Sequence, residues 1–249
     1  MKTEWDYTQL ADAYLERPEY APEVLERLFE LAGLREGDLV CDVGAGVAHL
    51  TLPLAGKGYK VIAVEPNDAM RANGQKRTAA FANVQWVDAT GEDTQQQSGA
   101  FDFVSFGSSF NVTDRTLALK ETYRLLKPGR WFTCMWNHRD LDDAIQTDIE
   151  GIIRGFIPDY GYGTRREDQA DVIAGSGLFT NVQAVSGGVM HVQTVEGVIE
   201  AWRSHGTLHR QAGDRFEQVI AAIADYLHAL GVETIDIPYT TRAWIARKA

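Results

Sequence analysis

The sequence predicts an α/β fold in which a parallel sheet carries helices on both faces. Strand-like apolar runs alternate with helical stretches from residue 39 to residue 136. The first run, residues 39–43, breaks into a glycine loop that begins at Gly44, and the next run ends in a carboxylate at Glu65. A buried strand, a glycine loop, a helix and a second strand that ends in an acid form half of a nucleotide-binding site.

Two helical segments come before this sheet. The first covers about residues 7–16, and the second, residues 22–34, places its apolar side chains on one face. Three more strands follow in the alternating region, at residues 84–89, 101–106 and 131–136. Adjacent Pro and Gly residues set the turn before the last of these strands.

The chain after residue 136 is expected to complete the sheet and to add helices. A helical insertion between the sixth and seventh strands would sit over the carboxyl ends of the strands, where open α/β sheets bind ligands. The expected elements are helix 140–157, loop 158–167, helix 167–178, a strand at 182–192 broken by Gly187 and Gly188, helices 195–208 and 213–230, and a strand at 238–247.

The length of 249 residues suits a single domain, residues 1–249. Within it we expect an N-terminal helical lid (1–34), a cofactor-binding core (35–136) and a region that completes the sheet and adds a helical cap (137–249, the cap chiefly 140–166 and 194–232).

The composition narrows the set of partners. The chain has 35 acidic and 24 basic residues, a net charge of −11, which disfavours nucleic acid as a partner because phosphate binding needs a basic face. The N-terminus has no apolar signal core, and no apolar run is long enough to span a membrane. We therefore expect a cytoplasmic protein without nucleic-acid or membrane partners.

Neither disulfide nor metal chemistry is expected. Cys41 and Cys134 both fall in predicted core strands, where buried free thiols behave as small hydrophobic groups. His205 and His209 share a helix face, but a zinc site would need a further ligand at suitable geometry.

The glycine loop itself discriminates among nucleotides. A dinucleotide fingerprint needs a third glycine for close packing of helix on strand, and His49 stands at that position. The glycine-lysine pair of a phosphate-binding P-loop is also missing here. Asp42, just ahead of the first glycine, is a poor neighbour for pyrophosphate and a good one for an ammonium group. Alternatively, Asp42 satisfies backbone amides of the loop.

The pattern Asp42-x-Gly44-x-Gly46-x-Ala48 resembles motif I of the class I S-adenosylmethionine-dependent methyltransferases, which usually have glycine where Ala48 stands. Strand 84–89, strand 101–106 with the loop after it, and the turn at 125–130 extend the resemblance over roughly residues 35–136. It implies a Rossmann-like, doubly wound, seven-stranded sheet, mostly parallel with an antiparallel last strand. The type-11 group of small-molecule enzymes is the nearest in character.

The resemblance implies a cofactor site for S-adenosylmethionine (SAM). Glu65 would bind the ribose hydroxyls, although it could instead be a solvated acid at a helix start. Asp88 would hold the adenine amino group, although an acid also caps turns well. The residues expected to contact the cofactor are Asp42, Gly44, Ala45, Gly46, Glu65, Pro66, Asp88, Ala89 and Ser108.

The catalytic residues are less clearly marked. His138, just past the fifth strand, is the candidate general base, or else a helix-start histidine paired with Asp140 or Asp142. Asn111 could orient the methyl acceptor by hydrogen bonding, or be ordinary loop chemistry. Ser109 and Phe110 lie in the same loop, which in the class runs beside the reactive methyl.

Substrate contacts are expected from three other places. Tyr160, Tyr162 and Arg165 could clamp an anionic or aromatic substrate, or the tyrosines could pack on neighbouring helices. Trp202 and His205 lie in the predicted cap. Tyr7 and Tyr14 resemble the aromatic residues with which related enzymes close a lid, although a helical apolar face explains them nearly as well.

The expected function is methyl transfer from SAM to an oxygen, nitrogen or carbon atom of a small molecule, leaving S-adenosylhomocysteine (SAH). We expect a monomer or homodimer. Two alternatives stay open: an inactive methyltransferase-like binding or activating subunit, and an NAD-linked oxidoreductase on a similar fold.

Overall fold

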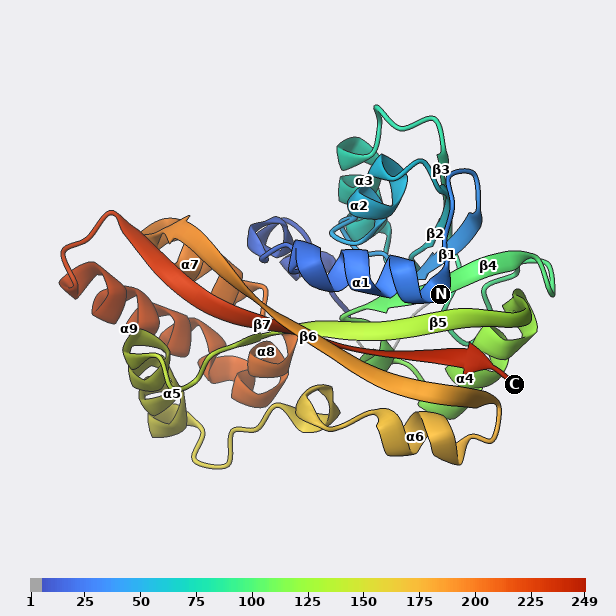
Figure 1. Ribbon diagram of the computed structural model, residues 1–249. Coiled ribbons are helices and arrows are strands. Elements are labelled where there is room, and N and C mark those ends of the chain that lie inside the picture. Colours follow the sequence, from blue (N-terminus) through green and yellow to red (C-terminus); the bar gives the residue numbers. More distant parts are fainter. Residues whose placement is uncertain (1–5) are drawn as a thin grey trace.

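The computed structural model describes residues 6–249 (Figure 1). Its centre is a seven-stranded sheet of order β3-β2-β1-β4-β5-β7-β6. The first five strands run parallel, and β7 pairs antiparallel with both β5 and β6. The predicted fold class, a mostly parallel sheet with an antiparallel last strand, is therefore confirmed. The strands are β1 Leu39–Val43, β2 Lys60–Val64, β3 Val84–Val87, β4 Phe101–Gly107, β5 Leu126–Arg139, β6 Phe179–Thr194 and β7 Thr234–Lys248.

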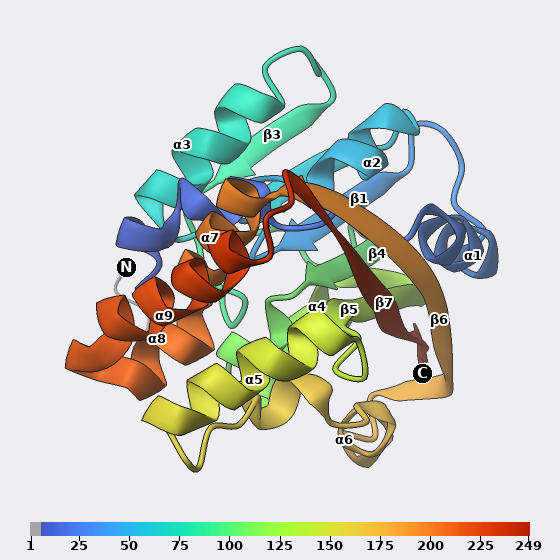
Figure 2. The ribbon, with the colours of Figure 1, turned by 90° about the vertical axis from the view of Figure 1, so that its left-hand side faces the viewer.

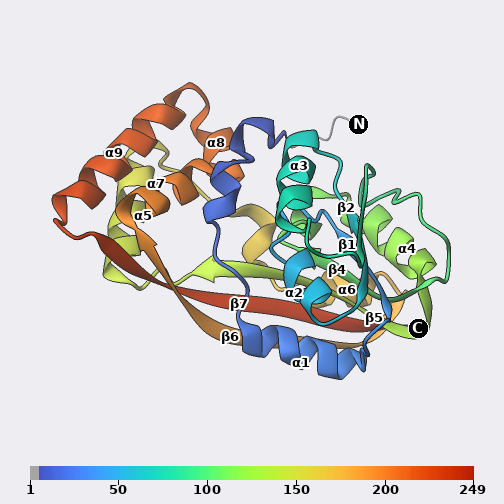
Figure 3. The same ribbon diagram turned by 90° about the horizontal axis from the view of Figure 1, so that it is seen from above.

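Helices cover both faces of this sheet, and each face has its own apolar cluster. One cluster joins α1 and α2 to the sheet through side chains such as Leu28 and Leu54, and the other joins α4 and α6 through Leu119 and Ile173. Seen from above, α1 runs beside β6 and β7 (Figure 3). The helices are α1 Pro22–Ala32, α2 Thr51–Gly56, α3 Asp68–Arg77, α4 Arg115–Leu125, α5 Ala144–Phe156, α6 Ala170–Gly175, α7 Val195–Arg203, α8 Gly206–Ala212 and α9 Phe216–Ala229.

A helical cap stands at one end of the sheet. Helices α5, α7, α8 and α9 pack around a third apolar cluster, which includes Ile153, Trp202 and Ile223 and also Ile237 from the extended end of β7 (Figures 1 and 2). The insertion between the sixth and seventh strands therefore consists of helices, as the sequence predicts. The long antiparallel pair of β6 and β7 joins this cap to the nucleotide-binding half of the sheet.

The sixth strand differs from its prediction. Gly187 and Gly188 do not break it, because they pair with Thr241 and Thr240 of β7 in a continuous ladder. A Cβ at residue 187 would lie 2.3 Å from Oε1 of Glu23 on α1. The glycine therefore serves close packing of α1 on the strand, and not a turn.

The N-terminal lid is also less regular than expected. In place of one helix over residues 7–16 there are two short 3₁₀ turns, Thr8–Leu10 and Ala13–Glu16. Figure 1 shows them between the cap and the nucleotide-binding half of the sheet. Between the two turns, Ala11 packs against Val47 of the glycine loop and Met70 of α3. Contacts on two sides hold this segment, so it does not need the hydrogen bonds of a long helix.

Within residues 6–249, no helix has the length and apolar character needed to cross a bilayer. The same residues contain no cluster of three His, Cys, Asp or Glu side chains that could hold a metal ion. Cys41 and Cys134 are buried and free, as expected from their positions in core strands. Their burial raises the pKa of each thiol, which keeps them protonated and inert.

Candidate cofactor and active site

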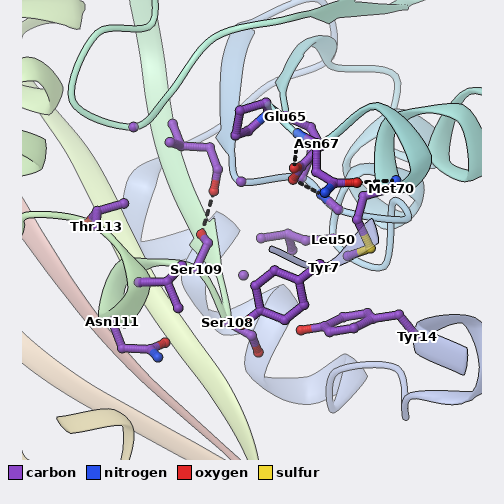
Figure 4. Close-up of a pocket in the computed structure, with 18 of the residues that line it drawn as sticks. Tyr7, Tyr14, Leu50, Glu65, Asn67, Met70, Ser108, Ser109, Asn111 and Thr113 are labelled. Carbon is purple, nitrogen blue, oxygen red and sulfur yellow. Dashed lines mark hydrogen bonds between the residues drawn. The ribbon is translucent and has the colours of Figure 1, made fainter. Parts of the chain in front are cut away.

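A cavity of about 780 Å³ opens at the carboxyl ends of β1, β2 and β4, between the sheet, the lid and the cap. This volume lies within the roughly 300–1,000 Å³ typical of ligand pockets. Figure 4 shows Glu65 and Asn67 close together, with Asn111 and the ring of Tyr14 across the cavity from them. The predicted site residues that line it are Tyr7, Tyr14, Asp42, Gly44, Ala45, Gly46, Glu65, Pro66, Ser108, Ser109, Asn111 and Tyr162.

The glycine loop is held against the end of β2. The backbone N–H groups of Gly44 and Ala45 donate to the carbonyl oxygen of Val64, at 2.8 and 3.0 Å. Gly44 and Gly46 have φ values of 67° and 57°, in the left-handed region that glycine adopts without strain. These residues therefore let the chain reverse directly beside the cavity.

Ala48 is the third small residue of this loop, at the position where the class usually has glycine. Its φ of 77° is also left-handed, which costs a non-glycine residue roughly 1–2 kcal/mol. The side chain is fully buried. The backbone conformation explains why a glycine is usual there, and the buried methyl group shows that alanine is accommodated.

Glu65 comes directly after β2 and points into the cavity. Its Oε2 accepts a hydrogen bond from the Gly46 N–H, and its Oε1 accepts one from the Asn67 N–H, both at 2.9 Å. Burial raises the pKa of Glu65 to about 7, while these backbone N–H groups and Arg71 act in the opposite direction. A carboxylate offers about four lone-pair sites, so two are left to accept from a ligand such as the hydroxyls of a ribose.

Asp42 lies on β1 under the loop. Its two oxygens accept hydrogen bonds from the hydroxyl groups of Thr51 and Ser105, at 2.7 and 3.0 Å. Burial raises its pKa to about 6. The alternative that Asp42 satisfies backbone amides of the glycine loop is wrong, because the amides of Gly44 and Ala45 donate to Val64 and that of Gly46 to Glu65.

The structure does not bring Asp88 and Ala89 to the cavity wall. The Asp88 side chain is 55% exposed and lies 3.6 Å from the Arg71 guanidinium, whereas Ala89 is buried in the core. Instead, Thr90, Gly91 and the next residue, Glu92, line the cavity after β3. The sequence pattern located the correct strand end, but it could not say at which residue the chain turns toward the ligand.

The loop after β4 forms the opposite wall. Ser109 donates from Oγ to the Val43 carbonyl, which ties this loop to the end of β1. Asn111 accepts from the indole Nε1 of Trp136 through Oδ1, at 2.8 Å. Phe110, expected beside the substrate, turns the other way and packs fully buried against Phe106. Ser108, Ser109 and Asn111 therefore face the cavity, and Phe110 supports the loop from behind.

Side chains of the lid and its neighbours close the cavity. Tyr7 and Tyr14 pack edge to face with ring centroids 5.9 Å apart. His49 links the lid to the glycine loop, with Nε2 3.0 Å from the Tyr14 carbonyl and Nδ1 3.2 Å from Glu19. The hydroxyl of Tyr20 lies 3.1 Å from that of Ser108.

Several lining residues were not identified from the sequence. The sequence marks His49 only as the bulky residue that stands in place of a third glycine. No residue type or spacing marks the others as ligand contacts. They include Tyr20, Leu50, Met70, Thr207 and Arg210.

A smaller cavity of about 20 Å³, here called the side niche, adjoins the main one. Tyr7, Tyr14, Ser108, Asn111 and Thr207 line both. The side niche is completed by Arg17, Trp136, Arg165 and Gly206. Arg165 therefore reaches the site.

Besides Phe110, three predicted substrate residues line neither cavity. Tyr160, Trp202 and His205 are at most 2% exposed and lie within the cap. For Tyr160, packing on neighbouring side chains was the alternative interpretation, and its position agrees with it.

His138 is placed behind the site. Its side chain is buried, and its Nε2 lies 3.0 Å from the carbonyl oxygen of Arg165, to which it donates. Burial, together with the charges of Arg165 and Arg166, lowers its pKa to about 3. His138 lines neither cavity, and its partner is neither Asp140 nor Asp142. This placement does not favour the general-base interpretation, and the histidine instead anchors the Arg165 backbone.

The strand order, the glycine loop and the buried acid after the second strand together define a class I SAM-dependent methyltransferase. The model of the ubiE/COQ5 methyltransferase family matches residues 25–168. The chain belongs to this family. The expected resemblance, and SAM as the cofactor of the class, are thereby confirmed.

Individual relatives match over part of their length. Demethylmenaquinone methyltransferases of Staphylococcus aureus are 31% identical over 114 residues, which cover 44% of this chain and 47% of theirs. That of Staphylococcus carnosus is 30% identical over the same length. The chain thus spans about half the length of the curated relatives it matches.

Solved structures share the fold across nearly the whole chain. A protein described as a type II methyltransferase from Anaeromyxobacter dehalogenans has a TM-score of 0.65 at 20% identity, covering 93% of this chain and 97% of its own. Phosphoethanolamine N-methyltransferase 2 of Haemonchus contortus, solved with SAH, has a TM-score of 0.53 at 16% identity, covering 91% and 52%. At sequence identities of 20% and 16%, these similarities show a shared fold only.

The residues at the cavity fit SAM. Glu65 is buried, oriented by two backbone N–H groups, and keeps lone pairs for two hydroxyl donors. The left-handed glycines leave room for a ligand to approach the backbone at the loop. Asp42 supplies negative charge near the same loop, where a cationic group is favoured.

Proposed function

We propose that this protein transfers a methyl group from SAM to an oxygen, nitrogen or carbon atom of a small-molecule acceptor. The observation that carries the proposal is the buried Glu65 carboxylate, held by the Gly46 and Asn67 amides at the edge of the one large cavity described for residues 6–249. The cytoplasmic location and a monomeric or homodimeric state stay predictions from the sequence.

The residues of the chain have distinct tasks in this proposal. Glu65 accepts hydrogen bonds from the ribose hydroxyls, and the glycine loop forms the floor beneath them. When bound, SAM supplies a methyl group that its sulfonium has already activated. The wall from Ser108 to Asn111 faces the acceptor, and Tyr7 and Tyr14 exclude water. Such positioning is worth roughly 7–11 kcal/mol in favourable cases.

The acceptor is assigned only to the class of small molecules. The curated relatives act, by their names, on demethylmenaquinone, and one structural neighbour on phosphoethanolamine. These acceptors differ in size and charge. The cap encloses the cavity through Tyr162, Thr207 and Arg210.

Isothermal titration with SAH tests this proposal, with NAD as the control ligand. Micromolar binding of SAH and no binding of NAD is the expected result, and it would justify a screen of acceptors. Binding of NAD alone would favour the oxidoreductase alternative. If folded protein binds neither, a methyltransferase-like binding subunit becomes the better description.

A further inference from the structure

The side niche sits in a group of four arginines drawn from distant parts of the chain. Arg17 follows the second 3₁₀ turn of the lid, Arg139 ends β5, and Arg165 and Arg166 lie in the 3₁₀ turn Gly163–Arg166. Among residues 6–249, none of these guanidinium groups has a carboxylate within 4 Å, although fourteen other ion pairs form. Uncompensated charge of one sign is costly when it is withdrawn from water.

The group is also short of hydrogen-bond acceptors. Arg139 is 7% exposed, and its Nε and one terminal nitrogen have no partner, since its guanidinium stacks on the Trp202 ring. The Nε of Arg165 is likewise buried without a partner. Burial lowers the pKa of Arg165, and the positive charges of Arg17 and Arg139 lower it further because like charges repel.

The contact between Arg165 and His205 adds to this shortage. One Arg165 terminal nitrogen lies 3.3 Å from His205 Nε2, and the Leu208 N–H points at His205 Nδ1, also at 3.3 Å. Burial and the surrounding arginines hold the pKa of His205 well below its usual range, so the ring is neutral. A neutral imidazole has a single acceptor nitrogen. It can therefore satisfy only one of these two donors.

The side-chain amide of Asn111 provides a further hydrogen-bond donor at the side niche. The indole N–H of Trp136 can only donate, so the Asn111 atom that faces it, at 2.8 Å, must be the carbonyl oxygen. The amide NH₂ group then points away from Trp136. Asn111 lines both the side niche and the main cavity.

The size of the side niche limits what it can hold. Its volume of about 20 Å³ is close to the space needed by one water molecule. A ring does not fit, but the oxygens of a small charged group do. Because the side niche shares its lining with the main cavity, a molecule lying in the main cavity can place such a group there.

We propose that the side niche binds an anionic oxygen group of the methyl acceptor, a carboxylate or a phosphate, through Arg17 and Arg165 with help from Asn111. This assignment rests on the proposed methyltransferase function and narrows its acceptor to anionic small molecules. Arg17 is already oriented for the task, because its Nε and one terminal nitrogen are fixed by the side chain and carbonyl of Ser204. The planar guanidinium geometry suits both oxyanions.

The test compares acids with neutral molecules of the same shape. The dissociation constants of acetate, benzoate and 4-hydroxybenzoate are measured against acetamide, benzamide and 4-hydroxybenzamide by ligand-observed NMR, with inorganic phosphate alongside, on protein saturated with SAH. At least one acid should bind about tenfold more tightly than its amide, as expected for a charge-assisted hydrogen bond. This preference should largely disappear in Arg165→Gln and Arg17→Gln.

Arg203→Gln is the matched control. It removes the same charge from the same cap, but Arg203 is engaged with Glu200 and Glu217 at its surface, so the acid preference should persist. The proposal is overturned if no acid in the panel binds better than its amide, or if the preference survives in both niche variants. The wild-type comparison decides the matter even if a niche variant does not fold.

The SAH titration separates this inference from the proposed function. If SAH binds and no acid is preferred, the side niche is wrongly assigned while the methyltransferase proposal stands. If SAH does not bind, the function fails, and the acid preference is then measured without SAH and still decides whether the side niche takes an anion.

Discussion

The Cα of Gly44 lies against the side chain of Ser109, so closely that a Cβ at residue 44 would be 2.4 Å from the Cβ of Ser109. The first residue belongs to the glycine loop after β1, and the second to the loop after β4. Ser109 Oγ also donates to the carbonyl of Val43. The two walls of the cavity are thus joined at the point where the strand order reverses.

Gly44→Ala should destabilise the protein by about 3 kcal/mol. The left-handed backbone (φ 67°) costs an alanine roughly 1–2 kcal/mol, and overpacking adds a similar amount. Gly99→Ala is the matched control, because Gly99 has φ 64° and no atom within 4 Å of the added Cβ. Urea denaturation should show only the backbone cost, about 1 kcal/mol, for the control. Equal losses in the two variants would mean that the contact with Ser109 is unimportant.

Glu65→Gln should weaken SAH binding by ten-fold or more, on the order of 1.5–3 kcal/mol for a charged hydrogen bond. The amide keeps the shape of the side chain but loses the charge and one acceptor. Calorimetry measures the effect. Glu30→Gln on the exposed face of α1 removes the same charge far from the cavity and should leave affinity unchanged. A Glu65 variant that binds SAH as tightly as the wild type would contradict this placement of the ribose.

The affinity for SAH should rise with pH. Burial raises the pKa of Glu65 to about 7, so the acid is partly protonated near neutrality, and only its ionised form accepts from both ribose hydroxyls. Affinity should therefore increase through about pH 7 and level off above it. In Glu65→Gln the affinity for SAH should depend less steeply on pH. The remaining change should be centred near pH 6, because burial raises the pKa of Asp42 to about 6. An unchanged pH profile in that variant would assign the titration to another group.

His138 should lower the free energy of unfolding as the pH falls below neutrality. Its pKa in the folded state is about 3, below the ordinary value of 6.5, so the unfolded chain takes up the proton first as pH falls below 6.5. Between pH 7 and pH 5 this amounts to about 2 kcal/mol. His138→Gln should lose about that much less stability over the same interval, measured by urea denaturation at each pH.

The control for His138 is His228→Gln, at an exposed site on α9. It should follow the wild-type dependence on pH. If His138→Gln also follows the wild type, then His138 takes up its proton as readily in the folded protein as in the unfolded chain, and the description of its environment is wrong.

Much of the cofactor half could be predicted from local patterns. The run that ends at Val43, the left-handed turn at Gly44 and the acid at Glu65 are close in sequence, and parallel strands bring their carboxyl ends to one edge whatever the rest of the chain does. Side-chain direction was harder to predict. Phe110 and Asn111 are neighbours, yet one supports the loop from the core and the other lines the cavity.

The sequence by itself determined the class of fold, the cofactor class and the loop that holds it, because these depend on alternating apolar runs, glycine conformations and short-range spacing. Tertiary structure decided which residues line the side niche. Arg17, Asn111 and Arg165 meet only when the lid, the sheet and the cap pack together. No local pattern in the chain marks this meeting, because the three residues are far apart in sequence and share one environment only after the chain has folded.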